Sequence, residues 1–283
     1  MGISGGGNTI LGNNELYYNT RGVWINSNLD AADGGLFSIN KDTGQTIWER
    51  QISSADGGKS ISLSLSANNT LYSPDVYNDT FTAYDATNGS LKWTYQFSGG
   101  HTNDESKIAD DGTIYTSREN TTIIKIYAFN SDGSTKWMYS TSTNYTGDIK
   151  SETRFALTSD RLYFGISTAD SGSYAPTDHG RLYAFNPATG ELLWIYETGN
   201  ISSSIVVDAD GTVYAVNNSS SAIDKKIFAI NPDGTLKWQF NTGLQDMTYN
   251  NIILRSDGVL LLSKNIFNFD NYPIVLIDTT IED

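Results

Sequence analysis

The sequence predicts an all-β fold, a β-propeller built from four-stranded antiparallel blades. Three observations lead to this prediction. A hairpin-forming stretch recurs along the 283 residues, and its copies carry tryptophans at positions 48, 93, 137, 194 and 238, which are 45, 44, 57 and 44 residues apart. The chain combines 17 Tyr, 11 Phe and 6 Trp with 26 Gly, a composition that suits strands separated by tight turns. No long stretch shows the apolar period of a helix.

The recurring stretch is clearest at Leu182–Gly199, LYAFNPATGELLWIYETG. Two short runs of aromatic and branched residues, Leu182–Phe185 and Leu192–Glu197, flank the turn-forming segment Asn186–Glu191. Strand-like runs on either side of such a turn predict a β-hairpin. Related stretches occupy residues 36–52, 81–97, 126–140 and 227–243.

Two further strands precede each hairpin. Ser202–Val207 and Thr212–Val216 flank an Asp-rich turn, and Lys107–Ala109 and Thr113–Thr116 flank another. Four strands in a repeat of this length are typical of a propeller blade, and a blade needs neighbours to cover its two faces. We therefore expect a single propeller domain over residues 1–283, with blades at about 8–52, 60–97, 105–141, 153–198, 201–242 and 250–283.

The sixth repeat is shorter than the others. It starts at Asn250 and stops at Thr279–Asp283, inside the turn that should precede its outermost strand, and it has no tryptophan. The remaining tryptophan, Trp24, falls in a loop. We expect six blades with an incomplete last blade; the alternative is a fragment of a seven- or eight-bladed propeller.

The hairpins carry a family signature. Ala83–Trp93 has the form A-x-D-x-x-x-G-x-x-x-W and resembles the tryptophan-docking repeat of pyrroloquinoline-quinone-like β-propellers. Residues 38–48 and 184–194 match it nearly, and in residues 128–137 and 229–238 the turn is one residue shorter. The resemblance covers nearly the whole chain. It implies that each tryptophan inserts between blades beside the neighbour's turn, which makes these tryptophans structural.

The resemblance also raises the question of a cofactor. Family members that use the quinone have eight blades, a bound calcium, a catalytic aspartate and commonly a disulfide of adjacent cysteines. This chain has no cysteine, and no calcium-binding set matches residue by residue. It is more similar to the cofactor-free members, many of which are cell-surface proteins. We expect no cofactor, with pyrroloquinoline quinone and calcium as the alternative.

Charge and composition exclude several classes of partner. The net charge is −14, with no basic stripe to bind phosphates, which argues against nucleic acid and anionic membrane surfaces. No segment approaches the ~20 apolar residues of a membrane span. The N-terminal residues Met1–Gly7 lack the pattern of a signal peptide. From the family resemblance we nevertheless expect an extracellular or cell-envelope protein, acting as a monomer or as a module of a larger chain.

No motif predicts catalysis or metal binding. The turns at Asp208–Gly211 and Asp110–Gly112 suggest calcium, but each Gly is followed by the start of a strand rather than by further ligands, so hairpin turns are expected. His101 and His179 have no second ligand at metal-binding spacing, and we expect both in solvated loops. No nucleophile elbow supports a Ser/His/Asp triad.

Variable loops point to a binding face. With strands named A to D from the axis outward, the A–B and C–D turns share one end of a blade, and the B–C loops share the other with the crossovers. The 13 extra residues between Trp137 and Trp194 fall in the B–C loop Ser167–Gly180. Exposed aromatic and acidic residues on this end suit a protein or carbohydrate ligand, and the candidates are Trp24, Tyr77, His101, Asp104, Tyr145, Asp170, Tyr174, Asp178 and His179.

The leading hypothesis is a non-catalytic, extracytoplasmic binding or scaffold module that uses its B–C-loop face. One alternative is an enzyme, either a quinone-dependent oxidoreductase or a polysaccharide lyase or hydrolase that uses carboxylates of this face. Another, suggested by the incomplete sixth blade, is a sensor domain of a larger protein.

Overall fold

The structure, a computed structural model, describes 17 separate parts of the chain. These are residues 9–20, 24–25, 28–29, 34–52, 62–75, 78–98, 101–119, 123–142, 148–149, 154–166, 168–169, 180–199, 201, 204–217, 226–241, 248–265 and 275–278. Throughout these ranges the regular secondary structure is β-strand, without a helix. The all-β prediction is therefore confirmed. The chain divides into two compact units, Met1–Thr141 and Ser142–Asp283.

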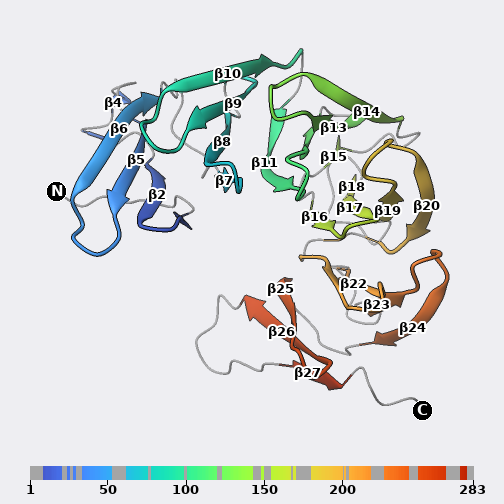
Figure 1. The fold of residues 1–283 in the computed structure, drawn as a ribbon. Helices are drawn as coiled ribbons and strands as arrows, with labels where there is room; N and C mark the ends of the chain where they lie inside the picture. The colour runs from blue at the N-terminus through green and yellow to red at the C-terminus, as the bar shows by residue number, and fades with distance from the viewer. Residues whose placement is uncertain are drawn as a thin grey trace. The chain divides into compact units, whose positions relative to one another are not determined.

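The first unit contains three four-stranded antiparallel sheets (Figure 1). They are β1 (Thr9–Leu11), β2 (Glu15–Thr20), β5 (Gly34–Asn40) and β6 (Thr46–Ile52); β7 (Ser64–Leu65), β8 (Thr70–Asp75), β9 (Thr80–Asp85) and β10 (Leu91–Gln96); and β11 (His101–Ile108), β12 (Ile114–Glu119), β13 (Ile123–Phe129) and β14 (Thr135–Ser142). Two short strands, β3 (Trp24–Ile25) and β4 (Asn28–Leu29), pair with each other within the loop between β2 and β5. In each sheet the strands neighbour one another in chain order, as expected of a blade.

The second unit repeats the pattern. Its sheets are β16 (Arg154–Leu157), β17 (Leu162–Ile166), β19 (Arg181–Phe185) and β20 (Leu192–Glu197); β21 (Val206–Val207), β22 (Val213–Val216), β23 (Lys226–Ile230) and β24 (Leu236–Asn241); and β25 (Thr248–Leu254), β26 (Val259–Asn265) and β27 (Val275–Asp278). A further pair joins β15 (Asp148–Ile149) to β18 (Thr168–Ala169). Among the described residues the sixth sheet has three strands.

One element differs from the expectation. His101 was expected in a loop, but it is the first residue of β11, where it pairs with Glu119 of β12. The pairing register shifts between Thr102 and Ser106, which indicates a β-bulge. Because the bulge interrupts the pairing, residues 103–105 do not alternate as strand residues do. The sequence pattern therefore did not indicate that β11 begins at His101.

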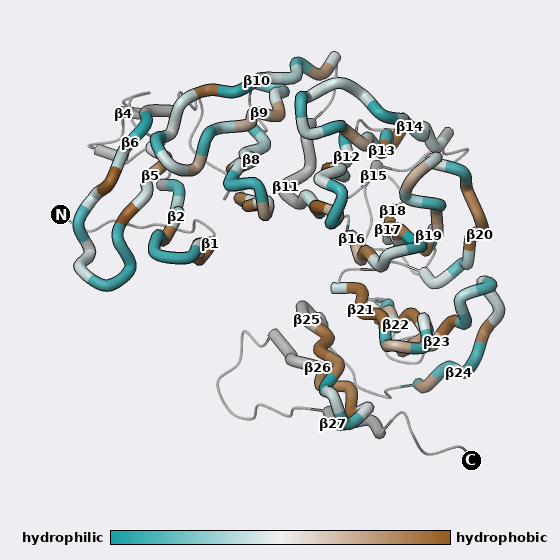
Figure 2. Tube along the Cα trace, in the orientation of Figure 1, coloured by the Kyte–Doolittle hydropathy of each residue, from teal (hydrophilic) through white to brown (hydrophobic). Residues whose placement is uncertain are grey.

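The middle strands are buried on both faces. All four residues of β22 and all five of β17 are buried, whereas the outer strand β20 alternates between half-buried and exposed residues. Continuous burial is expected when a sheet has another sheet against each face. Figure 2 shows the corresponding hydropathy, with hydrophobic residues along β26 and hydrophilic ones in the turn joining β5 to β6.

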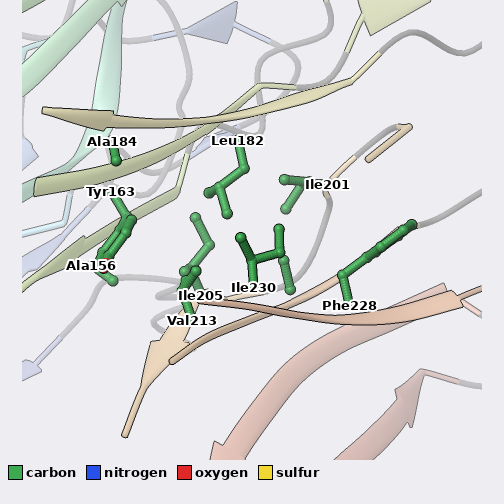
Figure 3. Close-up of a cluster of buried hydrophobic side chains, with 10 residues drawn as sticks. Ala156, Tyr163, Leu182, Ala184, Ile201, Ile205, Val213, Phe228 and Ile230 are labelled. Carbon is green, nitrogen blue, oxygen red and sulfur yellow. The ribbon is translucent and has the colours of Figure 1, made fainter. Parts of the chain in front are cut away.

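The cores lie between successive sheets of each unit. In the second unit, Tyr163 and Leu182 of one sheet pack with Val213, Phe228 and Ile230 of the next (Figure 3). In the first unit, Tyr72 and Phe81 pack with Ile114, Tyr127 and Phe129. At about 25 cal/mol per Å² of buried apolar surface, such side chains each stabilise the fold by about 1.5–3 kcal/mol.

Tryptophans connect the sheets through one repeated contact. The indole Nε1 of Trp48 donates to the carbonyl of Ala86 at 2.9 Å, and those of Trp93 and Trp194 donate to Ser131 and Pro232 at the same distance. Each acceptor lies in the C–D turn of the next sheet, 38 residues further on. A buried indole requires a partner for its N–H, and a backbone carbonyl in a tight turn supplies one whatever the side chain.

A glycine in each receiving turn makes room for the indole. Gly89, Gly133 and Gly234 have φ of 72°, 87° and 88°, a region that side-chain-bearing residues rarely adopt. A Cβ at these positions would lie only 2.7, 2.7 and 2.6 Å from atoms of Trp48, Trp93 and Trp194 respectively. The glycine of the repeat therefore has two roles, the backbone turn and the close approach of the neighbouring tryptophan.

The buried tyrosines predict a specific response to alkaline pH. Burial raises the pKa of Tyr115 and of Tyr163 from 10.0 to about 12. Because folding favours the neutral phenol, this stabilisation is complete below pH 10 and is lost as the pH rises from 10 towards 12. In chemical unfolding at a series of pH values, we expect the Tyr115→Phe/Tyr163→Phe double variant to lose less stability than the wild type across this window. Parallel loss in both proteins would contradict the prediction.

Candidate binding face

The two ends of each sheet differ in chemistry. At the end with the A–B and C–D turns, carboxylates are used to hold the turns themselves. Asp208 accepts the backbone N–H groups of Asp210 and Thr212 through Oδ1 and the hydroxyl of Tyr214 through Oδ2. Asp111 accepts the N–H of Thr113, and this bond is the main cause that lowers its pKa. Both carboxylate oxygens of Asp208 and Oδ1 of Asp111 therefore accept hydrogen bonds that hold the hairpin turns.

The opposite end carries the B–C loops and crossovers, and here the variable segments form structure of their own. The B–C loop of the fourth sheet contributes β18, which pairs with β15 from the crossover that precedes the same sheet. In the first sheet, β3 and β4 form a short ribbon within the B–C loop. The pairing of β15 with β18 places one crossover and one B–C loop side by side.

The B–C loop of the second sheet is fixed at its base. The backbone N–H of Asn78 donates to Asp75 Oδ1 at 3.0 Å, and its side-chain amide donates to Asp75 Oδ2 at 2.7 Å. From the outer strand, Gln96 Nε2 donates to the carbonyls of Asn78 and Asp79 at 2.9 and 3.1 Å. These bonds hold both ends of the short loop that contains Tyr77.

A buried arginine joins this loop to the third sheet. Arg118 of β12 is only 2% exposed, and its Nη2 lies 3.3 Å from Asp79 Oδ2. Its guanidinium carbon lies 5.3 Å from the centre of the Phe97 ring, a cation–π contact. Burial raises the pKa of nearby Tyr127, and the positive charge of Arg118 opposes that rise. The result is a charged, aromatic-lined link between two sheets on the side of the variable loops.

The long loops of the second unit are also closed at their bases. The Ser167–Gly180 loop ends at Gly180, whose carbonyl accepts the N–H groups of Thr198 and Gly199 at 3.0 and 3.1 Å. Next to it, Arg181 Nε donates to Glu197 Oε1 at 2.5 Å. In the fifth sheet the buried Asn217 exchanges backbone and side-chain bonds with Lys226. Hydrogen bonds therefore fix the bases of the loops in the second and fifth sheets and the C-terminal end of the Ser167–Gly180 loop.

Most of the candidate residues from the sequence lie outside the described part of the chain. This applies to Tyr77, Tyr145, Asp170, Tyr174, Asp178 and His179. For three others the structure gives the backbone: Trp24 lies in β3, His101 at the start of β11, and Asp104 within the bulge of β11. Their selection as binding residues stays a prediction.

The link made by Arg118, Asp79 and Phe97 was not predicted from the sequence. Arg118 belongs to the strand Ile114–Glu119, in which the residues from Ile114 to Arg118 are all buried. An arginine at the end of a strand that is otherwise expected to be buried could have indicated this link, because a buried charge requires a partner. Among the residues that the structure describes, no group of three His, Cys, Asp or Glu side chains lies together.

Comparison with known proteins identifies the family. The family model described as outer membrane protein assembly factor BamB matches residues 32–173 and 165–271. No match was found among curated proteins. The parts of the chain that the structure describes contain no apolar helix long enough to cross a membrane.

Solved structures show the fold. The Dos1 propeller is 12% identical, with a TM-score of 0.61, and the match covers 92% of this chain and 68% of that one. A europium-containing methanol dehydrogenase is 10% identical, with a TM-score of 0.60 over 83% of this chain and 50% of its own, so the chain spans half of that enzyme. A protein of unknown function from Bacteroides caccae is 14% identical, with a TM-score of 0.51 over 94% and 90%. The predicted β-propeller with about six blades is confirmed, and the chain belongs to the family of pyrroloquinoline-quinone-like repeat propellers described by the BamB model.

Proposed function

We propose that this protein is a non-catalytic binding or scaffold module of the cell envelope or exterior, and that its ligand, a protein or a carbohydrate, binds the B–C-loop face. The observation that carries the proposal is the contrast between the two ends of the sheets. Turns at one end satisfy their own polar groups, as Asp208 does, whereas the other end presents variable loops on fixed bases. Variable loops on a rigid scaffold are the usual location of binding sites.

The loop bases support a preorganised site. The Asp75–Asn78 bonds and the Arg118–Asp79 pair hold the second sheet's loop at both ends, so less conformational entropy is lost when a ligand binds there. The Arg181–Glu197 bond and the Gly180 contacts hold the C-terminal end of the Ser167–Gly180 loop. The family match supports a binding role, because it is to a model named for an assembly factor.

A loop replacement tests this proposal. One variant replaces residues 170–179 with a short Gly-Ser linker and keeps Gly180 and Arg181, and a second carries Trp24→Ala. Binding is measured on a glycan array and by pull-down from envelope extracts of the source organism. We expect at least one variant to bind its ligand ten or more times more weakly, a loss of about 1.4 kcal/mol.

The matched control changes the opposite end of the sheets. Asn88→Ala and Thr189→Ala alter exposed C–D turn residues and are expected to leave binding unchanged. Circular dichroism and melting temperature verify that all variants are folded. Full binding by both loop variants would overturn the assignment of the face, and so would loss of binding in the folded turn variants.

A further inference from the structure

The C–D turn of the second sheet contains the one Asn–Gly pair of the chain, Asn88–Gly89. In such a pair the backbone nitrogen of the glycine can attack the asparagine side chain, because glycine has no side chain of its own to obstruct the approach. Asn88 is exposed, and Gly89 is buried beneath it. The turn that receives Trp48 therefore carries a chemically labile peptide bond at its surface.

The reaction of this pair is a deamidation, which needs water and no other reagent. The Gly89 nitrogen bonds to Cγ of Asn88, the Cγ–Nδ2 bond breaks, and ammonia leaves with the amide proton of Gly89. The product is a cyclic succinimide, which water then opens. Opening at Cγ gives an aspartate at position 88. Opening at the main-chain carbonyl gives an isoaspartyl linkage, in which the backbone runs through Cβ and Cγ and is one atom longer.

Two hydrogen bonds within the turn oppose this reaction. The N–H of Gly89 donates to the carbonyl of Asp85 at 2.8 Å, so the attacking nitrogen is held in place. Oδ1 of Asn88 accepts the N–H of Ser90 at 2.8 Å, which restrains the side chain. Attack on Cγ requires the bond from Gly89 to break and the side chain to turn. The turn must therefore open before Asn88 can react.

Two side chains of β6 hold the turn closed from the first sheet. Trp48 Nε1 donates to the carbonyl of Ala86 at 2.9 Å, and Arg50 Nη1 donates to the carbonyl of Gly89 at 3.0 Å. The ring of Trp48 also lies against Gly89, since a Cβ there would be only 2.7 Å from it. The guanidinium of Arg50 is kept in position over the ring of Tyr84, 5.2 Å from its centre. Opening of the turn therefore requires these contacts with the first sheet to be lost.

The corresponding turns of the third and fifth sheets have an aspartate before the glycine. Each carboxylate, of Asp132 and of Asp233, accepts both the N–H and the hydroxyl of the residue that follows the glycine. The bonds from these hydroxyls are the main cause that lowers the pKa of both aspartates, so both are ionised at neutral pH. An ionised carboxylate is a poor target for a nucleophilic nitrogen. Among these turns, the reactive one is therefore that of Asn88.

We propose that Asn88 is a deamidation site that is controlled by the docking of the first sheet on the second. While Trp48 and Arg50 hold the turn, Asn88 persists; when the first sheet separates, the nitrogen of Gly89 becomes free to attack. An aspartate product fits the turn, as it does in the third and fifth sheets. An isoaspartyl product lengthens the backbone beside Gly89, where even a Cβ would collide with Trp48, so the first sheet can no longer dock. Deamidation therefore makes the separation of the two sheets irreversible.

Peptide mapping by mass spectrometry measures the reaction. The full chain is incubated at mildly alkaline pH, either folded or in urea, and the tryptic peptide Ser60–Lys92 is fragmented to locate the modified residue. An isoaspartyl methyltransferase labels the isoaspartyl product. In urea we expect Asn88 to deamidate at least ten times faster than in the folded chain, because the open turn is then the main form. The isoaspartyl product is expected to melt at a lower temperature than the wild type, whereas Asn88→Asp is expected to melt as the wild type does.

Variants of β6 test the control by the first sheet. Trp48→Phe/Arg50→Met removes both hydrogen-bond donors and keeps an aromatic ring and an unbranched stem, and we expect it to deamidate about ten times faster than the folded wild type. Arg50→Met alone is expected to react about three times faster, and it serves if the double variant does not fold. Trp194→Phe removes the equivalent bond to Pro232 in the second unit and is expected to leave the rate at Asn88 unchanged.

Several results would overturn the proposal. These are equal rates in the folded chain and in urea, no reaction in urea, and wild-type rates in the folded variants of β6. Equal acceleration by Trp194→Phe would mean that Asn88 responds to general loss of stability rather than to the first sheet. An isoaspartyl product that melts as the wild type does would show that the first sheet docks again.

Discussion

Gly133→Ala is expected to lower the free energy of unfolding by about 3 kcal/mol, the sum of two penalties. The residue has φ of 87°, where a side chain costs about 1–2 kcal/mol. Its Cβ would also lie 2.7 Å from the ring of Trp93, and overpacking of this kind costs about 1–3 kcal/mol. The ring has little freedom to move, because its Nε1 is bonded to Ser131 and its face packs on Tyr72, Phe81 and Phe129. Urea unfolding monitored by tryptophan fluorescence measures the loss.

Gly44→Ala is the matched control for this prediction. Gly44 has φ of 69° in the same motif, but a Cβ there meets nothing within 4 Å. We expect it to cost about 1–2 kcal/mol, from the backbone term alone. The difference between the two variants therefore isolates the contact with the tryptophan. Equal losses would show that the glycine is required only for the turn and that the indole adapts.

Much of the fold was predictable because each hairpin is determined by residues that are close together in the sequence. The hairpin around Trp93 is specified by strand residues on either side of Asp85–Ser90, and the glycine within that turn, Gly89, has φ of 72°. Turn chemistry and period-two patterns act over a few residues, so one copy suffices to recognise them. Repetition then gave the number of sheets, because each copy adds one sheet of the same order.

A second interaction, between a lysine and a threonine, also recurs in several copies of the repeat. Lys92, Lys136 and Lys237 each directly precede a repeat tryptophan, and they donate to Thr70, Thr113 and Thr212 of the same sheet at 2.7, 2.8 and 3.2 Å. In the fourth sheet the equivalent residues are Leu193 and Arg161, so both members change together. Comparison of the copies position by position identifies this pair from sequence alone, since both partners recur at a nearly constant separation.

The candidate binding face was less predictable, because its contacts are not repeated. Arg118, Asp79 and Phe97 meet only once, from two different sheets, and no other copy has an arginine at the position of Arg118. Loop residues such as Trp24 and Tyr174 were chosen by type and exposure, which do not determine where a side chain points. The position of a non-repeated contact depends on how adjacent sheets pack, and local patterns do not encode that.

Asp79→Asn is expected to destabilise the protein by about 2–3 kcal/mol. Asn keeps the shape of the side chain and tolerates the φ of 53° at this position, so the main change is the loss of the negative charge beside Arg118. Removing one partner of a fully buried pair costs about 3–5 kcal/mol, because the other charge stays buried. Asp79 is 29% exposed, so solvent screens part of the interaction and the lower figure applies. Urea unfolding again measures the loss.

Two comparisons establish that the buried arginine is the cause. Asp42→Asn removes the carboxylate of an exposed pair, in which Asp42 is 70% exposed and 3.1 Å from Lys41, and is expected to cost less than about 0.5 kcal/mol. Adding Arg118→Met to Asp79→Asn is expected to restore part of the stability, because Met fills the space over Phe97 without a buried charge. If the double variant is as unstable as the two single changes added together, the carboxylate and the guanidinium act independently. The link between the second and third sheets then depends on the packing against Phe97 rather than on the ion pair.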